Sequence, residues 1–182
     1  MSALEAICAE IPEVLEELRL NLSTVLDSGS LAPSERWGVA IAVALSSRSR
    51  RLAEALIASR PPQVTMKTVQ DALAAAAMMG MTNTFYRFQH LLGKPSYPRK
   101  PAHLRMKRRE KPASSSAAFE LFSLAVSAMN DCETCVRSHE ATLLERGTTE
   151  DQIHDAVRIA AVIHGTAVAL DSASLIREDN SA

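Results

Sequence analysis

The sequence has few aromatic residues, few cysteines and almost no net charge. Aromatic residues make up 4% of the 182 residues, helix-forming Ala, Leu and Met are abundant, and no segment shows sustained two-residue alternation. This disfavours β-sheets, whose strands are rich in aromatic and β-branched residues. A formal net charge of −1 gives no global field that would draw the chain to nucleic acid or a membrane. We therefore predict an all-α fold with neither kind of partner.

The three cysteines, at positions 8, 132 and 135, are too few for a disulfide scaffold, and an odd number cannot all pair within one chain. The first residues carry an early acid and no basic stretch before an apolar run, so no secretory signal is predicted. No uninterrupted apolar run approaches the ~20 residues of a membrane span. The sequence thus predicts a cytoplasmic protein, where a cysteine pair is more often catalytic or metal-binding than structural.

Apolar residues recur with helical spacing between proline, glycine and serine signals. We predict one domain, 1–182, with an N-terminal half (1–93) that lacks the cysteine pair, a connector (94–113) and a catalytic half (114–182). The predicted helices are 4–20 (kinked or split at Pro12), a short helix 21–27, 33–45, 51–59, one that starts at 65 or 68 and ends at 92, 117–129, 132–146 and 150–176.

The connector contains prolines and a dense run of basic residues. Arg99 to Lys111 holds seven Lys/Arg and one acid, while the rest of the chain carries 13 basic and 20 acidic residues. Two interpretations remain open: a solvated connector, or a docking strip for an acidic protein partner. A nucleic-acid role is disfavoured because no aromatic residues interleave the basic ones.

The two halves resemble a faded repeat. The segment that begins at Glu35 is similar to the segment that begins at Glu120, and 69–76 resembles 153–160 at nearly the same offset along the chain. In this alignment the residues opposite Cys132 and Cys135 are Ser47 and Arg50. If the repeat is real, only the C-terminal half carries chemistry.

Cys132 and Cys135 form a C-x-x-C motif at the start of a predicted helix, with Asn130 and Asp131 as its expected caps. The unpaired amides and dipole of a helix N-terminus stabilise a thiolate, which is the reactive form of cysteine. The spacing places the two sulfurs close enough to bridge, and the closed loop is too short to add much stability. The motif therefore indicates reversible oxidation.

His139 follows Cys135 by four residues and shares its helical face, where a neutral imidazole can accept the thiol proton. Glu120 precedes the Asn130 turn by roughly 15 Å of helix, and His139 follows it by roughly 10–13 Å. If the two helices form an antiparallel hairpin, the carboxylate and the imidazole meet at similar depth. A carboxylate in that position would orient the imidazole and raise its basicity.

Glu120, Cys132-x-x-Cys135 and His139 together resemble the spaced motif of the alkyl hydroperoxidase D proteins, within the carboxymuconolactone-decarboxylase-like superfamily. The resemblance includes the run from Ala77 to Arg87 and spans nearly the whole chain. This chain departs from some members, which have a second histidine between the cysteines, because Glu133 and Thr134 fill that gap.

The resemblance implies an all-helical protein with a duplicated core, often a homotrimer. It implies a lipoyl-dependent peroxidase that also reduces a partner peroxiredoxin. Electrons would come from dihydrolipoamide on a 2-oxo-acid dehydrogenase component, with no bound cofactor or metal. By position, Cys135 would attack the peroxide, Cys132 would donate a proton and resolve, and Glu120 and His139 would form the proton relay.

Other interpretations of these residues remain. Cys132, Cys135 and His139 could bind zinc, although a fourth ligand at suitable spacing is missing. The protein could be an electron-transfer adaptor for a peroxiredoxin with negligible peroxidase activity of its own, an idea motivated by the basic strip. A decarboxylase-like or isomerase role would not need two cysteines. Elsewhere, we expect His164 to be a hydrogen-bonded buried residue, and Met78, Met79 and Met81 to fill gaps in the core.

Overall fold

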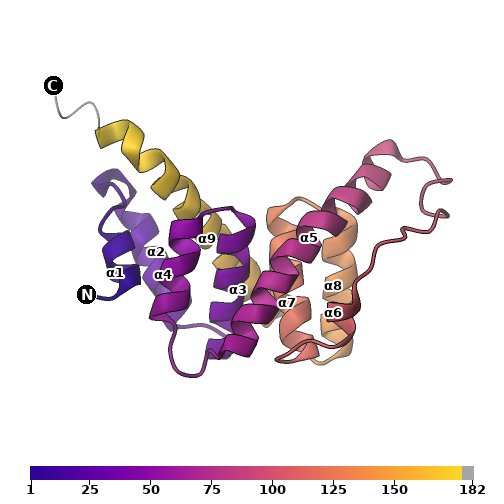
Figure 1. The fold of residues 1–182 in the computed structure, drawn as a ribbon, viewed down its shortest axis with the longest axis horizontal. Helices are drawn as coiled ribbons and strands as arrows, with labels where there is room; N and C mark the ends of the chain where they lie inside the picture. Colours follow the sequence, from indigo (N-terminus) through magenta and orange to yellow (C-terminus); the bar gives the residue numbers. More distant parts are fainter. Residues whose placement is uncertain (178–182) are drawn as a thin grey trace.

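The computed structural model describes the backbone of residues 1–177 and the side chains of residues 1–173, and every regular element in that part of the chain is helical. The predicted all-α fold is confirmed. In Figure 1 helices α1, α2 and α4 lie toward one end and α6, α7 and α8 toward the other. The elements are α1 Ala3–Cys8, the 3-10 turn η1 Glu13–Leu15, α2 Glu16–Asp27, α3 Pro33–Ser46, α4 Arg50–Ser59, α5 Met66–Leu92, α6 Lys107–Glu110, α7 Ser116–Met129, α8 Glu133–Glu145 and α9 Glu150–Arg177.

Helices α3 and α7 form the centre of the core, and they pack against each other and against α5 and α9. Their contact is closest at Gly38, where an added Cβ would lie 2.1 Å from Cζ of Phe122. No side chain larger than hydrogen fits there unless the Phe122 ring or the helices move. Phe119 and Phe122 of α7 are among the largest fully buried side chains. The central pair therefore supplies a large share of the apolar burial that stabilises the fold.

Local signals set the helix ends much as predicted. Pro12 splits the first predicted helix into α1 and α2. The Ser115 hydroxyl accepts from the Ala118 N–H at the start of α7. Gly93 and Gly147 have positive φ after α5 and α8, a conformation that glycine adopts without steric cost.

The predicted repeat is present in the order and length of the helices. The bounds of α7 are those of α3 moved by one constant offset, from 33 to 116 at the start and from 46 to 129 at the end. Each of these helices is followed by a residue with positive φ, Arg48 or Asp131, and then by the N-cap of the next helix, Ser49 or Cys132. These pairs are separated by the same offset.

The register expected from the sequence was wrong by two positions at the cysteines. Ser49 and Leu52, rather than Ser47 and Arg50, occupy the positions equivalent to Cys132 and Cys135. Alanine-rich helices resemble one another in several alignments. The tight turn with positive φ has only one register, which the sequence comparison did not detect.

The connector is anchored at its C-terminal end. Arg108 on α6 forms an ion pair of 2.8 Å with the buried carboxylate of Asp71 on α5. The same carboxylate accepts hydrogen bonds from the backbone of Ala113 and from the backbone and hydroxyl of Ser114. The basic residues farther upstream, Arg99, Lys100, Arg105 and Lys107, are exposed. The connector is thus solvated in its first part and fixed to the core in its second.

Helix α9 departs from two expectations. Its segment Glu150–Ala173, with mean hydropathy 1.3, is long and apolar enough to cross a membrane, although 50% of the apolar window is buried inside the fold, as in a core helix. His164 was expected to be buried and is exposed, at a shallow cavity between α7 and α9. Its Nδ1 lies 3.2 Å from the Ser47 hydroxyl, so the expected hydrogen bond is present.

Candidate active site

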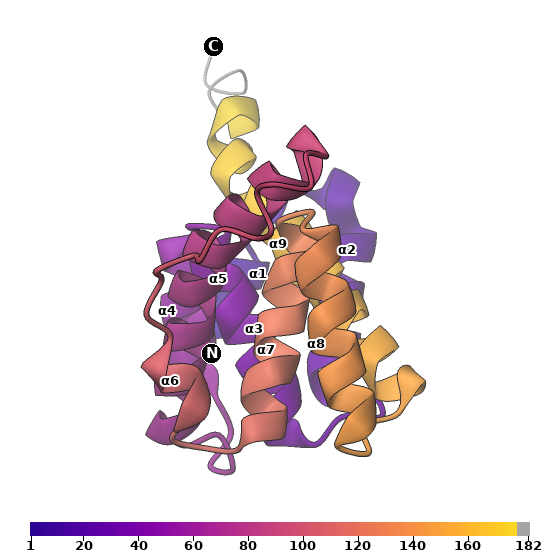
Figure 2. The same ribbon diagram turned by 90° about the vertical axis from the view of Figure 1, so that its right-hand side faces the viewer.

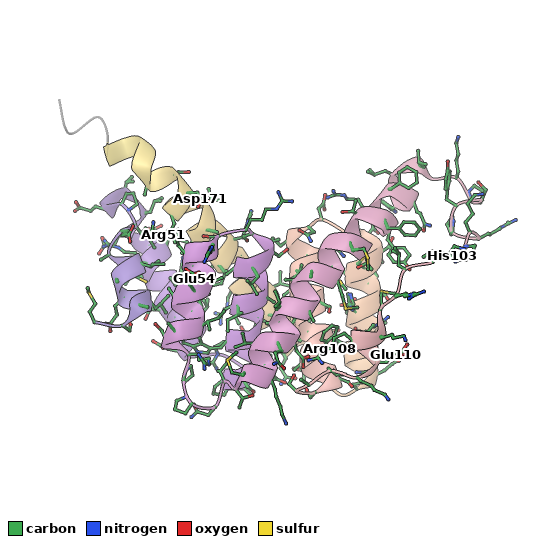
Figure 3. The ribbon with its side chains drawn as sticks, in the orientation of Figure 1. Arg51, Glu54, His103, Arg108, Glu110 and Asp171 are labelled. Atoms are coloured by element: carbon green, nitrogen blue, oxygen red, sulfur yellow. A yellow bond between two sulfur atoms is a disulfide. The ribbon has the colours of Figure 1, made fainter. Side chains whose placement is uncertain are left out.

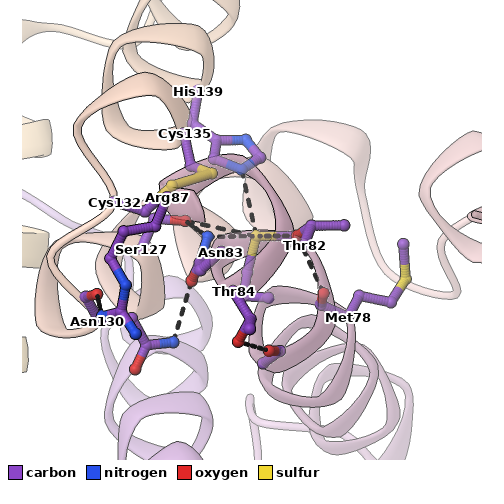
Figure 4. Close-up of a disulfide and its surroundings, with 12 residues drawn as sticks. Met78, Thr82, Asn83, Thr84, Arg87, Ser127, Asn130, Cys132, Cys135 and His139 are labelled. Atoms are coloured by element: carbon purple, nitrogen blue, oxygen red, sulfur yellow. Dashed lines mark hydrogen bonds between the residues drawn. A yellow bond between two sulfur atoms is a disulfide. The ribbon is translucent and has the colours of Figure 1, made fainter. Parts of the chain in front are cut away.

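The turn between α7 and α8 presents the two cysteines, and the two helices stand side by side in Figure 2. Asn130 ends α7, Asp131 has a φ of 54°, and Cys132 is the N-cap of α8. Asn130 and Asp131 were expected to cap α8, but they form the reversing turn, and the cysteine itself takes the cap position. Cys132 and Cys135 are joined by a disulfide with a Cα–Cα distance of 5.3 Å (Figure 4).

The structure brings Glu120 and His139 into direct contact. Nδ1 of His139 lies 2.6 Å from Oε2 of Glu120, and the side chains are 7% and 3% exposed. The two residues face each other because α7 and α8 form the antiparallel hairpin that the spacing predicted. All four residues predicted from the sequence therefore gather at one place in the molecule, and their catalytic roles stay predictions.

A fifth residue at this place, Arg109, was not predicted. Its Nε lies 2.8 Å from Oε1 of Glu120, so that carboxylate receives Arg109 on one oxygen and His139 on the other. Burial alone would raise the pKa of Glu120. The hydrogen bonds and positive charges of His139 and Arg109 outweigh it and lower the pKa from 4.5 to about 2. Glu120 is therefore ionised at neutral pH.

Helix α5 closes the other side of the cysteines. Asn83 donates to the Ser127 hydroxyl at 2.9 Å and accepts from the Asn130 side chain at 2.9 Å. Arg87 donates to the Asn130 carbonyl at 2.9 Å (Figure 4). These bonds hold the turn that carries Cys132. The sequence resemblance pointed to the run from Ala77 to Arg87 without assigning roles to its residues.

A cavity of about 260 Å³ leads to the site, and Cys135 and His139 line it together. The connector contributes Met106 and Arg109 to its wall, so the basic strip reaches the entrance of the cavity. A cavity of about 430 Å³ borders the same turn through Asn83, Arg87 and Asn130, and one of about 540 Å³ lies between the first helices and α9. Neither is lined by Cys132, Cys135 or His139. The other lining residues of the smaller cavity are Met79, Thr82, Tyr86, Thr134 and Ser138.

The donor set gives little support to the zinc interpretation. Within the described part of the chain, no three His, Cys, Asp or Glu side chains are grouped so that they could hold a metal ion. Both ring nitrogens of His139 have neighbours other than the cysteines, the Glu120 carboxylate and the Met79 thioether. The arrangement fits proton transfer beside a redox-active sulfur pair.

Comparison with known proteins agrees with this geometry. Residues 95–178 match the model of the carboxymuconolactone decarboxylase family. The chain is 56% identical over 173 residues to "Alkyl hydroperoxide reductase AhpD" of Anaeromyxobacter dehalogenans, covering 95% of this chain and 93% of that protein. It is 41% identical over 180 residues to the protein of that name from Rhodospirillum centenum, covering 98% and 97%. The chain therefore belongs to the AhpD family of alkyl hydroperoxide reductases, within the carboxymuconolactone-decarboxylase-like superfamily.

Proposed function

We propose that this protein is a thiol-dependent alkyl hydroperoxide reductase that cycles Cys132 and Cys135 between dithiol and disulfide. The observation that carries the proposal is the Cys132–Cys135 disulfide, with Cys135 lining a cavity together with His139 and with Glu120 held against the imidazole. The names of the AhpD relatives support the same reaction class.

In the proposed reaction, His139 takes the proton of Cys135, and the thiolate attacks the terminal oxygen of ROOH. An S–O bond forms, the O–O bond breaks, and the leaving alkoxide takes the proton that His139 removed from Cys135 and departs as ROH. The sulfenic acid on Cys135 then condenses with the Cys132 thiol, which releases water and forms the disulfide. Glu120 stabilises the imidazolium that forms in the first step.

The disulfide must then be reduced by a dithiol. We propose dihydrolipoamide as the reductant, carried by a lipoylated 2-oxo-acid dehydrogenase component: its two thiols become a disulfide, and their two electrons and protons go to Cys132 and Cys135. A partner peroxiredoxin would be reduced by the same exchange. We further propose that the protein is cytoplasmic and a homotrimer, and light scattering of the purified protein tests the trimer.

The reaction is tested with Cys135→Ser. Purified wild-type protein supplied with dihydrolipoamide should consume an alkyl hydroperoxide, and the variant should lose this turnover entirely. Cys8→Ser is the control, because Cys8 lies in the first helix and packs against the core away from the site. An active Cys135→Ser protein would refute the proposal. Mass analysis after one equivalent of peroxide should show the loss of two thiols, at residues 132 and 135.

A second candidate function is an electron-transfer adaptor that passes electrons to a peroxiredoxin and has negligible peroxidase activity. The basic strip, Arg99–Lys111, favours this candidate because it borders the cavity through Met106 and Arg109. Its exposed cations would attract an acidic protein surface and accelerate the encounter. The charge-reversed variant Arg99→Glu/Lys100→Glu should slow reduction by an acidic lipoylated domain about tenfold at low salt, and leave reduction by free dihydrolipoamide unchanged.

The matched control for that variant is Arg50→Glu/Arg51→Glu. Both residues are exposed on α4, and Arg51 lies at the end of the molecule opposite His103 of the strip (Figure 3). The control makes the same change in net charge and should have less than a twofold effect. Equal slowing in both variants would show that only net charge matters. Vigorous peroxide turnover with free dihydrolipoamide would exclude the adaptor and favour the reductase.

A further inference from the structure

Met79 belongs to the hydrophobic core, as expected, and its sulfur also lies among polar groups. The residue is 3% exposed on α5, next to Cys135 and His139 in the wall of the cavity. A thioether has no hydrogen to donate and can only accept. Its Sδ lies 3.3 Å from His139 Nε2, 3.4 Å from the Ser127 hydroxyl, 3.6 Å from the Thr82 hydroxyl and 3.8 Å from the Asn83 amide nitrogen.

The imidazole of His139 is thus held between two acceptors. Its Nδ1 faces the ionised Glu120 carboxylate at 2.6 Å, so Nδ1 carries a proton. Its Nε2 faces the sulfur of Met79 at 3.3 Å. If Nε2 were bare, its lone pair would point at the lone pairs of the sulfur. A ring protonated on both nitrogens satisfies both contacts.

We propose that Met79 is a positioning residue whose thioether holds a proton on Nε2 of His139 while Cys132 and Cys135 are disulfide-bonded. The groups around the ring agree with a cationic form. Helix α7 supplies the Glu120 carboxylate, and α6 supplies Arg109, which is paired with that carboxylate. Helices α5 and α8 supply no Asp, Glu, Lys or Arg to the cavity around the ring. Their lining residues are Met79, Thr82, the titratable phenol Tyr86, Thr134, the disulfide-bonded Cys135 and Ser138.

The held proton has a use if the proposed function is correct. A donor thiolate that attacks the disulfide forms a new S–S bond with one cysteine and releases the other as a thiolate. An N–H already present on Nε2 can pass its proton to the released sulfur, which becomes a thiol. The second donor thiol then completes the exchange and gives its proton to the other cysteine. Two electrons and one proton thus come from the donor, one proton comes from Nε2, and Nε2 regains a proton from solvent. Met79 therefore prepares the oxidised site for reduction.

Nitrogen NMR of the histidine rings in the oxidised, full-length protein tests the proposal without any turnover. In the wild type, both ring nitrogens of His139 should show the chemical shifts of protonated nitrogen at neutral pH. Met79→Leu keeps the volume but removes the acceptor, and the ratio of rings with and without a proton on Nε2 should fall about tenfold. Met78→Leu is the matched control, because Met78 is only partly buried and its side chain points away from the ring (Figure 4).

Two further measurements separate proton holding from packing. Met79→Gln restores an acceptor atom and should restore the wild-type nitrogen chemical shift of Nε2. At neutral pH, dithiothreitol should reduce the disulfide more slowly in Met79→Leu than in the wild type, because fewer rings carry the Nε2 proton. This holds whether or not dihydrolipoamide is the natural reductant. A bare Nε2 in the oxidised wild type, or identical Nε2 chemical shifts in the wild type and Met79→Leu, would overturn the proposal. Failure of peroxide turnover alone would count only against the proposed function.

Discussion

The two halves of the molecule share a backbone plan and differ in chemistry. Each half has a central buried helix, a turn with one residue of positive φ and a second helix that starts at the next residue or two. At the constant offset that relates α3 to α7, Trp37 and Leu56 in the first half stand opposite Glu120 and His139 in the second. The scaffold does not by itself create an active site, since the N-terminal half has the scaffold and lacks the reactive side chains.

An aspartate–serine pair has the same structural role in each half. Asp71 on α5 binds the backbone and hydroxyl of Ser114 just before α7. Asp155 on α9 binds the backbone and hydroxyl of Ser30 just before α3. The two serines are separated along the chain by the same interval as the two aspartates. Each half therefore fixes the start of the other half's central helix. This structural role is found in both halves, whereas the reactive side chains are found in one.

The largest expected difference is in peroxide turnover between variants of Glu120 and Glu35, the two glutamates that the sequence comparison aligned. Glu120→Gln should lower peroxide turnover about 100-fold, because a neutral amide cannot stabilise the imidazolium of His139. Glu35→Gln removes the same charge from the N-terminal half, where the Glu35 side chain only accepts from the Ala32 N–H at the start of α3. Steady-state peroxide consumption should change less than twofold in this control. Equal losses in the two variants would contradict the assignment of chemistry to one half.

The pH dependence of stability should differ between wild type and Glu120→Gln. Because the pKa of Glu120 is lowered from 4.5 to about 2 in the folded state, its contribution is complete above pH 4.5 and is lost as the pH falls toward 2. Between pH 6 and pH 3, the free energy of unfolding should fall by up to about 2 kcal/mol more in the wild type than in Glu120→Gln. Urea unfolding of both oxidised proteins measures this. Parallel curves would mean that the carboxylate is not held as the structure shows.

The smallest expected effect concerns the two aspartates. The side chain of Asp71 is fully buried and also binds Arg108 and Ala113, whereas that of Asp155 is 14% exposed. We expect Asp71→Asn to lower the free energy of unfolding by about 2 kcal/mol and Asp155→Asn by about 1 kcal/mol. Chemical denaturation ranks the two. Limited proteolysis should also cut Asp71→Asn faster within the connector, and a reversed ranking would show that burial does not set the difference.

Local signals explain why so much of the fold followed from the sequence. Pro12, Ser115, Gly93 and Gly147 act on the residues beside them, so their positions alone set helix ends. The grouping of Cys132, Cys135 and His139 is equally local, because all three lie within the first two turns of α8 or at its cap. Placing Glu120 beside His139 needed one further assumption, that the two helices form an antiparallel hairpin.

Arg109 and Met79 could not be predicted in the same way. Arg109 is one of several basic residues in a segment that reads as solvated, and only the packing of the connector brings it to Glu120. Met79 lies in an apolar stretch of α5, where its sulfur is indistinguishable by sequence from a core methionine. In both cases the partner is distant along the chain, and no spacing rule connects the residues.

Gly38 lies in the N-terminal half, which lacks the cysteine pair, but it affects the helix that carries Glu120 in the C-terminal half. A side chain at this position would overlap the Phe122 ring, so the small size of Gly38 allows α3 and α7 to approach closely. Phe122, which rests against it, is two residues from Glu120 on the same helix. The contact between Gly38 and Phe122 therefore lets the N-terminal half fix the position of the helix that carries Glu120.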